Sequence, residues 1–443
     1  MFDTICTLPL KSDIFAQVVH PTEPLFAIGL SSGHVHTYKL PSDSEVIADT
    51  SEDSASPPLK PTNSNGSIIP SLRRSSTASL SESGLGSLDT VWTTRRHKGS
   101  CRCLAFSHEG DLCYSAGTDG LVKAFYTETG KVVSKIAIPQ TVGSGGVDGP
   151  TVLHALSPQA LLLGTDSGKL YLHDLRQHSK EIVAKCSQTW TPHGEEHIND
   201  LVPLPASETS TSGFPKQWVS VGGTTLAVTD LRKGTIATSA DQEIELTSLT
   251  LVQGLKKGGT SVGEKVLVGQ SDGVVSLWER GVWGDLDERI VLERGGLGVD
   301  SLAEVPFGFG SGKLKMNEKL VAAGLEDGRI RFIRIGRNGV LAEMDAKHDE
   351  IDGVAAIGFD IEGRMITSGG QTVKVWTEAK GLPGGGRPST TKHEISSSED
   401  DDIDESDLDE TSDEDNQSKP KRKKRKRNKG KDKSGGKALD FSL

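Results

Sequence analysis

The chain of 443 residues contains few aromatic and few large apolar side chains, with 5% aromatic and 34% hydrophobic residues. These fractions are low for a chain that is globular throughout. No apolar run reaches the length of about 18 residues that a membrane span needs, and the N-terminus lacks the pattern of a secretory signal. The five cysteines show no metal-ligand spacing, and their odd number argues against a disulfide framework. We therefore expect a protein of a reducing compartment with no membrane partner.

Two polar segments account for the low apolar content. Residues 41–87 are rich in Ser, Pro, Asp and Glu, and residues 381–443 are still more polar. Neither segment contains enough apolar surface to offset the entropy lost on ordering. We expect both to be disordered, as an insertion and a C-terminal tail, and we expect residues 1–380 to form one domain.

A hairpin pattern recurs seven times. An apolar strand leads into a turn of small residues, usually closed by glycine, and a second apolar strand follows; the copies span residues 26–38, 114–125, 161–174, 219–230, 266–279, 321–334 and 366–377. The Asp-Gly pairs that begin at Asp119, Asp272 and Asp327 supply the positive φ that a tight hairpin requires. Apolar strands of this kind suit sheets that are buried on both faces.

A fixed position near the end of each copy forms an aromatic-rich column. Its members are Tyr38, Phe125, His173, Thr229, Trp278, Ile333 and Trp376. This is the position at which WD40 repeats carry tryptophan. The glycines that open the seven turns lie 88, 47, 58, 47, 55 and 45 residues apart, against about 40–45 residues for a WD40 blade. The pattern predicts an all-β fold, a seven-bladed WD40 β-propeller.

The remaining repeat positions fit the same fold. In WD40 proteins a histidine commonly joins a buried network with a strand Ser or Thr, the turn Asp and the Trp. The best candidates are His97, Ser115 and Asp119, with Phe125 in place of the tryptophan, so we expect a structural and incomplete network. The residues after Trp376 are rich in Gly and Pro and cannot form an outer strand. We expect residues 2–8 to supply that strand and close the ring, and we expect residues 41–87 to separate the third and fourth strands of the first blade.

Three motifs that resemble catalytic or metal sites do not carry that chemistry. His193 and His197 match an inverted zinc-protease pattern, but Pro192 and Gly194 are incompatible with the helix that this pattern needs. Gly164–Lys169 and Gly308–Lys313 have the wrong spacing for a phosphate loop. Cys101 and Cys103 alternate along a predicted strand, so we expect their thiols to face the same side and to serve packing. We expect no enzyme, no cofactor, no metal and no small-molecule substrate.

The tail has two blocks of opposite charge. Residues 394–415 contain thirteen acidic side chains and no basic one, and residues 419–433 contain eleven basic side chains and one acidic one. The basic core is Lys421, Arg422, Lys423, Lys424, Arg425, Lys426 and Arg427. Three interpretations stand: a nuclear or nucleolar import signal, a non-specific contact to RNA phosphates, or a solubilising tail.

Short patterns in the tail and in the blades suggest further sites. Residues with Asp or Glu three positions further on resemble acidophilic kinase sites: Ser396, Ser397, Ser398, Ser406, Thr411 and Ser412. The pairs Asp174 with Arg176 and Asp230 with Arg232 resemble the ending through which some WD40 proteins dock to cullin-RING adaptors. Ordinary ion pairing at the blade edge is the alternative.

The arrangement resembles the WD repeat-containing protein 55 family. The resemblance rests on Phe15–Pro21, Leu25–Gly29, Thr93–Arg102, the degenerate column and the acidic-then-basic tail. It implies a propeller in the nucleus and nucleolus, which acts as a scaffold for proteins of pre-ribosomal particles in ribosome biogenesis and rRNA processing. We expect the propeller to be monomeric. A ubiquitin-ligase adaptor and a chromatin-binding propeller are the alternatives.

Overall fold

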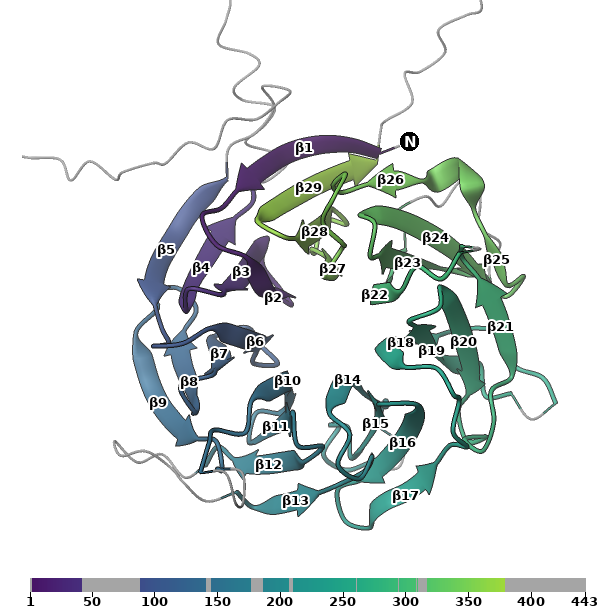
Figure 1. Cartoon of the computed structure of the whole chain (residues 1–443), viewed down its shortest axis with the longest axis horizontal. Helices are drawn as coiled ribbons and strands as arrows, with labels where there is room; N and C mark the ends of the chain where they lie inside the picture. The colour runs from purple at the N-terminus through teal and green to yellow at the C-terminus, as the bar shows by residue number, and fades with distance from the viewer. Residues whose placement is uncertain are drawn as a thin grey trace, which may run out of the picture. The chain divides into compact units, whose positions relative to one another are not determined.

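Seven small antiparallel sheets surround a central axis and form a β-propeller (Figure 1). This computed structural model describes residues 2–41, 88–140, 145–176, 186–206, 210–259, 261–293, 295–307, 309 and 317–378. The described strands belong to one compact unit. Within these residues no helix is long and apolar enough to span a membrane. The predicted fold class is confirmed.

Each blade runs from an inner to an outer strand, and the blades are numbered along the chain. Blade 1 contains β2 (Ile14–Val19), β3 (Leu25–Leu30), β4 (His34–Lys39) and β5 (Asp89–Arg95). Blade 2 contains β6 (Cys101–Phe106), β7 (Leu112–Gly117), β8 (Leu121–Tyr126) and β9 (Val132–Ala137). Blade 3 contains β10 (Pro150–Ser157), β11 (Ala160–Thr165), β12 (Leu170–Asp174) and β13 (Gln188–Trp190). Blade 4 contains β14 (Ile198–Pro203), β15 (Gln217–Gly222), β16 (Thr225–Asp230) and β17 (Gly234–Thr238).

The second half of the ring follows the same order. Blade 5 contains β18 (Leu246–Gln253), β19 (Glu264–Gln270), β20 (Val274–Glu279) and β21 (Glu288–Val291). Blade 6 contains β22 (Val299–Glu304), β23 (Lys319–Leu325), β24 (Arg329–Ile335), β25 (Gly339–Val340), the short 3-10 helix η2 (Ala342–Met344) and β26 (Ala346–Lys347). Blade 7 contains β27 (Ala356–Phe359), β28 (Met365–Gly369), β29 (Thr372–Glu378) and β1 (Phe2–Pro9). The seven predicted hairpins are thus the second and third strands of the seven blades.

The N-terminal strand closes the ring as the sequence predicts. Strand β1 pairs antiparallel with β29, from Phe2 opposite Glu378 to Pro9 opposite Thr372. Figure 1 shows β1 as the outermost strand of this blade, beside β29. The Phe2 ring stacks at 4.8 Å on Phe332 of blade 6. The closing strand therefore covers the edge of β29 and also contacts the neighbouring blade.

The long insertion lies where it was expected. Strand β5 pairs with β4 across the gap between Pro41 and Leu88. Residues 42–87 and the tail lie outside the described residues, so the prediction of disorder in both, and the domain limits drawn from it, stay predictions.

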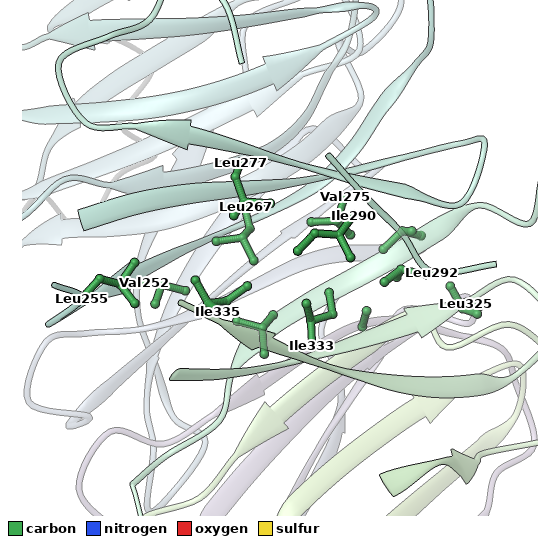
Figure 2. Close-up of a cluster of buried hydrophobic side chains, with 13 residues drawn as sticks. Val252, Leu255, Leu267, Val275, Leu277, Ile290, Leu292, Leu325, Ile333 and Ile335 are labelled. Carbon is green, nitrogen blue, oxygen red and sulfur yellow. The ribbon is translucent and has the colours of Figure 1, made fainter. Parts of the chain in front are cut away.

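The hydrophobic core is divided into layers between adjacent blades. Figure 2 shows the layer between blades 5 and 6, where Leu267, Val275 and Ile290 lie near Ile333 and Ile335. All five side chains are at most 5% exposed. A blade therefore cannot bury its apolar faces without both neighbours, which makes the closed ring the stable unit.

The innermost strand of six blades contains a β-bulge near its start, which the sequence did not reveal. The bulged residues are Phe15, Arg102, Thr151, Asn199, Thr247 and Asp300. Three of them donate a hydrogen bond to the next blade: Arg102 to Asp166, Asn199 to the Leu246 carbonyl, and Thr247 to the Val299 carbonyl.

The bulge at Arg102 contradicts the expectation for the two cysteines. Cys101 packs against Ala27 and Val35 of blade 1, whereas Cys103 packs against Leu153 and other residues of blade 3. An extra residue in a strand reverses the side to which the following side chains point. The two thiols therefore face opposite neighbours, although both are buried and serve packing.

Candidate interaction faces

The antiparallel order of the strands gives the ring two faces with different loops. One face carries the turns between second and third strands and the connections from one blade to the next. Its loops contact each other, since the Arg96 and His97 amides donate to the Gly33 carbonyl. The opposite face carries the loops between first and second strands and between third and fourth strands.

The first of these faces is strongly acidic over blades 4 to 7, and we call this part the acidic face. It is formed by the loops 191–197, 223–224, 239–245, 271–273, 292–293, 295–298, 326–328, 348–355 and 370–371. These described loops contain no Lys or Arg and twelve acidic residues: Glu195, Glu196, Asp241, Glu243, Glu245, Asp272, Glu293, Glu326, Asp327, Asp349, Glu350 and Asp352. At the start of β22, burial and the nearby Glu326 raise the pKa of Asp300 to about 6. These described loops therefore carry a strongly negative net charge, although Arg329, Arg331 and Lys347 of the adjacent strands pair with Glu293, Asp327 and Glu350.

The opposite face of the same four blades has a mixed charge with a basic excess. Its described loops contain five acidic residues: Asp285, Asp287, Glu318, Asp360 and Glu362. They contain eight basic residues: Lys216, Arg232, Lys233, Lys256, Lys257, Arg280, Arg337 and Arg364. Several of these form ion pairs, such as Arg364 with Asp360 at 2.6 Å.

The predicted network in blade 2 is present beneath the loops. The His97 ring binds Asp119 through Nδ1 and Ser115 through Nε2, both at 2.8 Å. Burial lowers the pKa of His97. Burial acts to raise the pKa of Asp119, but the hydrogen bond to His97 and the charges around it outweigh burial and hold the pKa low. The network fixes the turn at Asp119–Gly120.

An arginine occupies the place beside the missing tryptophan, and sequence reasoning did not find it. The Arg96 guanidinium lies 4.4 Å from the centre of the Phe125 ring and 4.9 Å from that of Trp92. It also donates to the Gly130 carbonyl. Arg96 is 8% exposed, so these cation–π contacts replace the usual tryptophan bond. In the sequence, only the position of Arg96 directly before His97 could have pointed to this role.

Related networks hold other blades. The His193 ring binds Thr225 and Ser220, each at 2.9 Å, and burial lowers the His193 pKa to about 4. His193 is therefore the blade 4 counterpart of His97, which explains half of the apparent zinc motif. Its partner His197 instead lies 3.4 Å from Glu245.

The two tryptophans of the column are anchored by hydroxyl groups. In blade 7, the Thr367 hydroxyl binds both His348 and the Trp376 indole at 2.8 Å. In blade 5, the Trp278 indole donates to Ser276 at 3.1 Å. The turn residues Asp272 and Asp327 accept backbone amides of their own hairpins. All these predicted repeat positions lie in the hairpins.

The two Asp-x-Arg pairs differ in geometry. The Arg176 guanidinium binds the Asp174 carboxylate through Nε at 2.9 Å and Nη2 at 2.5 Å. At the second pair, Asp230 accepts the backbone amides of Arg232 and Lys233 and the Gln217 side chain. Within the described chain the Arg232 guanidinium forms no ion pair. The basic core 421–427 and the six candidate phosphorylation sites lie outside the described residues.

Comparisons with known proteins agree with the fold. The family model for the WD domain, G-beta repeat, matches residues 88–125. This match begins at the outer strand of blade 1 and ends in the third strand of blade 2, so the sequence repeat is offset from the structural blade by one strand.

Fungal relatives resemble the chain over most of its length. WD repeat-containing protein jip5 of Aspergillus niger is 53% identical over 86% of this chain and 82% of the relative. The protein of the same name from Emericella nidulans is 52% identical over 87% of each chain. That of Coccidioides immitis is 48% identical over 90% of this chain and 87% of the relative.

Proposed function

Because the chain belongs to the family of WD repeat-containing proteins named jip5, we propose that it is a scaffold for pre-ribosomal particles in the nucleolus. WD40 propellers are typically non-catalytic interaction scaffolds, and this coarser role follows from the fold. The finer role, in ribosome biogenesis and pre-rRNA processing, is supported by the resemblance of the repeats and the tail. The observation that carries it is the acidic face.

The acidic face suits basic polypeptides. Proteins that neutralise RNA phosphates are themselves rich in Lys and Arg. A face with twelve acidic residues and no basic one in its described loops attracts such proteins and accelerates their binding. It also repels free RNA. We therefore assign to this face the basic proteins of the particle, before or while they contact RNA.

The basic core of the tail supplies the second part of the proposal. Residues 421–427 are seven consecutive basic side chains, which we assign to nuclear and nucleolar import, with an additional salt-sensitive contact to RNA phosphates. Phosphorylation of the neighbouring serines and threonines would add negative charge beside this run. Import and the contact to RNA phosphates would keep the propeller near its partners.

Capture of the full-length chain from cells tests the proposal. We expect precursors of ribosomal particles among the captured proteins, and defects in pre-rRNA processing when the chain is depleted. A matched variant without residues 419–433 should leave the nucleolus while its propeller remains folded. Unchanged location of this variant would refute the import assignment, and absence of pre-ribosomal proteins would refute the scaffold assignment.

A second candidate function rests on Arg232. The exposed Arg232 guanidinium, unpaired within the described residues, is available to a partner, whereas Arg176 is held by Asp174. An adaptor role in a cullin-RING ubiquitin ligase predicts that Arg232→Ala abolishes co-purification of the ligase adaptor. Arg337→Ala, on the same face, is the matched control.

A further inference from the structure

A groove of about 760 Å³ lies at the seam where the ring closes. One wall is formed by β4, the third strand of blade 1, together with Thr90 and Thr93 of β5. The other wall is the end of β1 and the segment that follows it, from Leu8 to Ser12. The groove thus joins the first blade to the last one.

Two imidazoles line this groove side by side. His34 and His36 alternate along β4 and therefore project from the same face of the strand. Their rings are 6.3 Å apart, centre to centre, with an angle of 83° between the planes. The histidines of the networks are arranged differently. His97 and His193 each use both ring nitrogens to bind hydroxyl or carboxyl groups.

Each ring is oriented by a hydroxyl group at the same nitrogen. The Nδ1 atom of His34 lies 3.1 Å from Ser32 Oγ, and the Nδ1 atom of His36 lies 2.9 Å from the Tyr38 hydroxyl. Within the described residues neither Nε2 atom has a hydrogen-bond partner. When Nδ1–H donates to the hydroxyl oxygen, the Nε2 lone pair is free for a ligand. Metal-binding histidines are commonly fixed in this way by a partner at the second nitrogen.

From this geometry we propose that His34 and His36 bind one divalent transition-metal ion of the zinc and copper class. Imidazole nitrogens suit these ions. With a metal–nitrogen distance of about 2.1 Å, two rings that share a tetrahedral ion have centres roughly 5.3 Å apart. The observed 6.3 Å is longer, so both side chains must rotate toward each other to share an ion.

The site has two protein nitrogens and an open remainder. No group of three or more His, Cys, Asp and Glu suited to a metal occurs among the described residues, so water fills the other positions. Lys11 also lines the groove. Such a site binds an ion more weakly than a closed structural site. Both histidines lie on β4 of blade 1, so a bound ion stabilises the folded chain by mass action.

Electron paramagnetic resonance with one equivalent of Cu²⁺ tests the site in the untagged full-length chain. We expect nitrogen couplings from two imidazoles, and we expect them to vanish in His34→Ala with His36→Ala. Copper that binds weakly to the tail, through its carboxylates or His393, gives at most the coupling of a single imidazole and is the same in both proteins. His197→Ala is the matched control, because His197 is a solvent-accessible histidine of another blade. Couplings that survive in the double variant would overturn the proposal.

A second measurement keeps the test independent of the folding of that variant. Tyr38→Phe removes only the hydroxyl that orients His36, so we expect it to fold and to weaken Zn²⁺ binding about tenfold by titration calorimetry. Zn²⁺ should raise the unfolding midpoint of the wild type and raise that of Tyr38→Phe less. Equal affinities and equal midpoint shifts for the two proteins would contradict the assignment.

Discussion

The two faces of blades 4 to 7 share one backbone architecture and differ in charge. The acidic face has twelve acidic residues and no basic one in its described loops, whereas the opposite face has five acidic and eight basic residues. Turns on both faces need polar residues to bond their amides, but the turn geometry does not fix the sign of the charge. The fold therefore does not require the segregation of charge between the two faces.

The largest expected effect comes from reversing the charge of the acidic face. In Glu195→Lys with Glu196→Lys and Glu326→Lys, affinity for a basic polypeptide such as polylysine should fall roughly 100-fold, at about 1 kcal/mol for each reversed charge. Surface plasmon resonance at fixed salt measures this fall. The control is Lys216→Glu with Lys256→Glu and Lys257→Glu on the opposite face, and a similar loss there would remove the distinction between the faces.

The next effect concerns stability, and it compares the buried His97, which binds Asp119, with the exposed His197 on the same side of the ring. Asp119 holds the buried His97 at 2.8 Å, so His97→Ala leaves the buried Ser115 hydroxyl without this partner and leaves Asp119 only the Lys98 amide and Lys123. We expect a loss of about 2–4 kcal/mol in the free energy of unfolding, measured with urea. His197→Ala should cost little, since His197 is 46% exposed at its side chain. Equal losses would mean that the network does not stabilise the blade.

Stability should decrease in mild acid because of buried histidines beneath the acidic face. The pKa of His193 is lowered by burial from 6.5 to about 4, so below pH 6.5 the unfolded chain takes up a proton that the folded chain excludes. Stability from this residue is complete above pH 6.5 and declines toward pH 4, by up to about 1.4 kcal/mol per pH unit. In His193→Gln the slope of stability against pH should be smaller. Urea titrations between pH 4.5 and 7.5 measure it, and an unchanged slope would contradict the prediction.

The smallest effect concerns Arg102 in the bulge of β6. Its ion pair with Asp166 at 3.0 Å is exposed on both sides, 40% and 50%, so Arg102→Ala should change stability by less than about 1 kcal/mol. The variant also removes one of the few positive charges on the side of the acidic face. We expect polylysine to bind about twofold more tightly, by the same resonance assay. Weaker binding would indicate that Arg102 itself contacts the ligand.

The sequence predicted what every blade repeats. The hairpins and the column recur because each blade must make similar buried contacts, and histidine networks recur in blades 2, 4 and 7, so their spacing is visible in the chain. The closing strand was predictable for the same reason: β29 needed an outer partner, and residues 2–8 had none. One hairpin is weak evidence for a propeller, but seven hairpins with the same pattern predict the fold firmly.

The features that the sequence did not reveal depend either on one extra residue in a strand or on contacts between segments that only folding brings together. The bulge at Arg102 turns Cys101 and Cys103 to opposite sides, and no propensity marks an extra residue in a strand. Arg96 was missed because its contacts with Trp92 and Phe125 join residues of different blades. The acidic face became visible only when the strand order assigned each loop to one side. The groove at His34 and His36 could not be predicted, because one of its walls is formed only when β1 takes its place in the fold.

The seam of blade 7 sets the order in which the ring is completed. Pro9 pairs with Thr372, so a ribosome that adds about 5–20 residues per second makes the first strand some 20–70 seconds before its partner appears. Throughout that interval the nascent chain holds an unpaired strand at its beginning. A product that stops short of β29 therefore keeps an open ring with apolar blade surfaces in contact with water, which makes premature termination recognisable to the cell's chaperones.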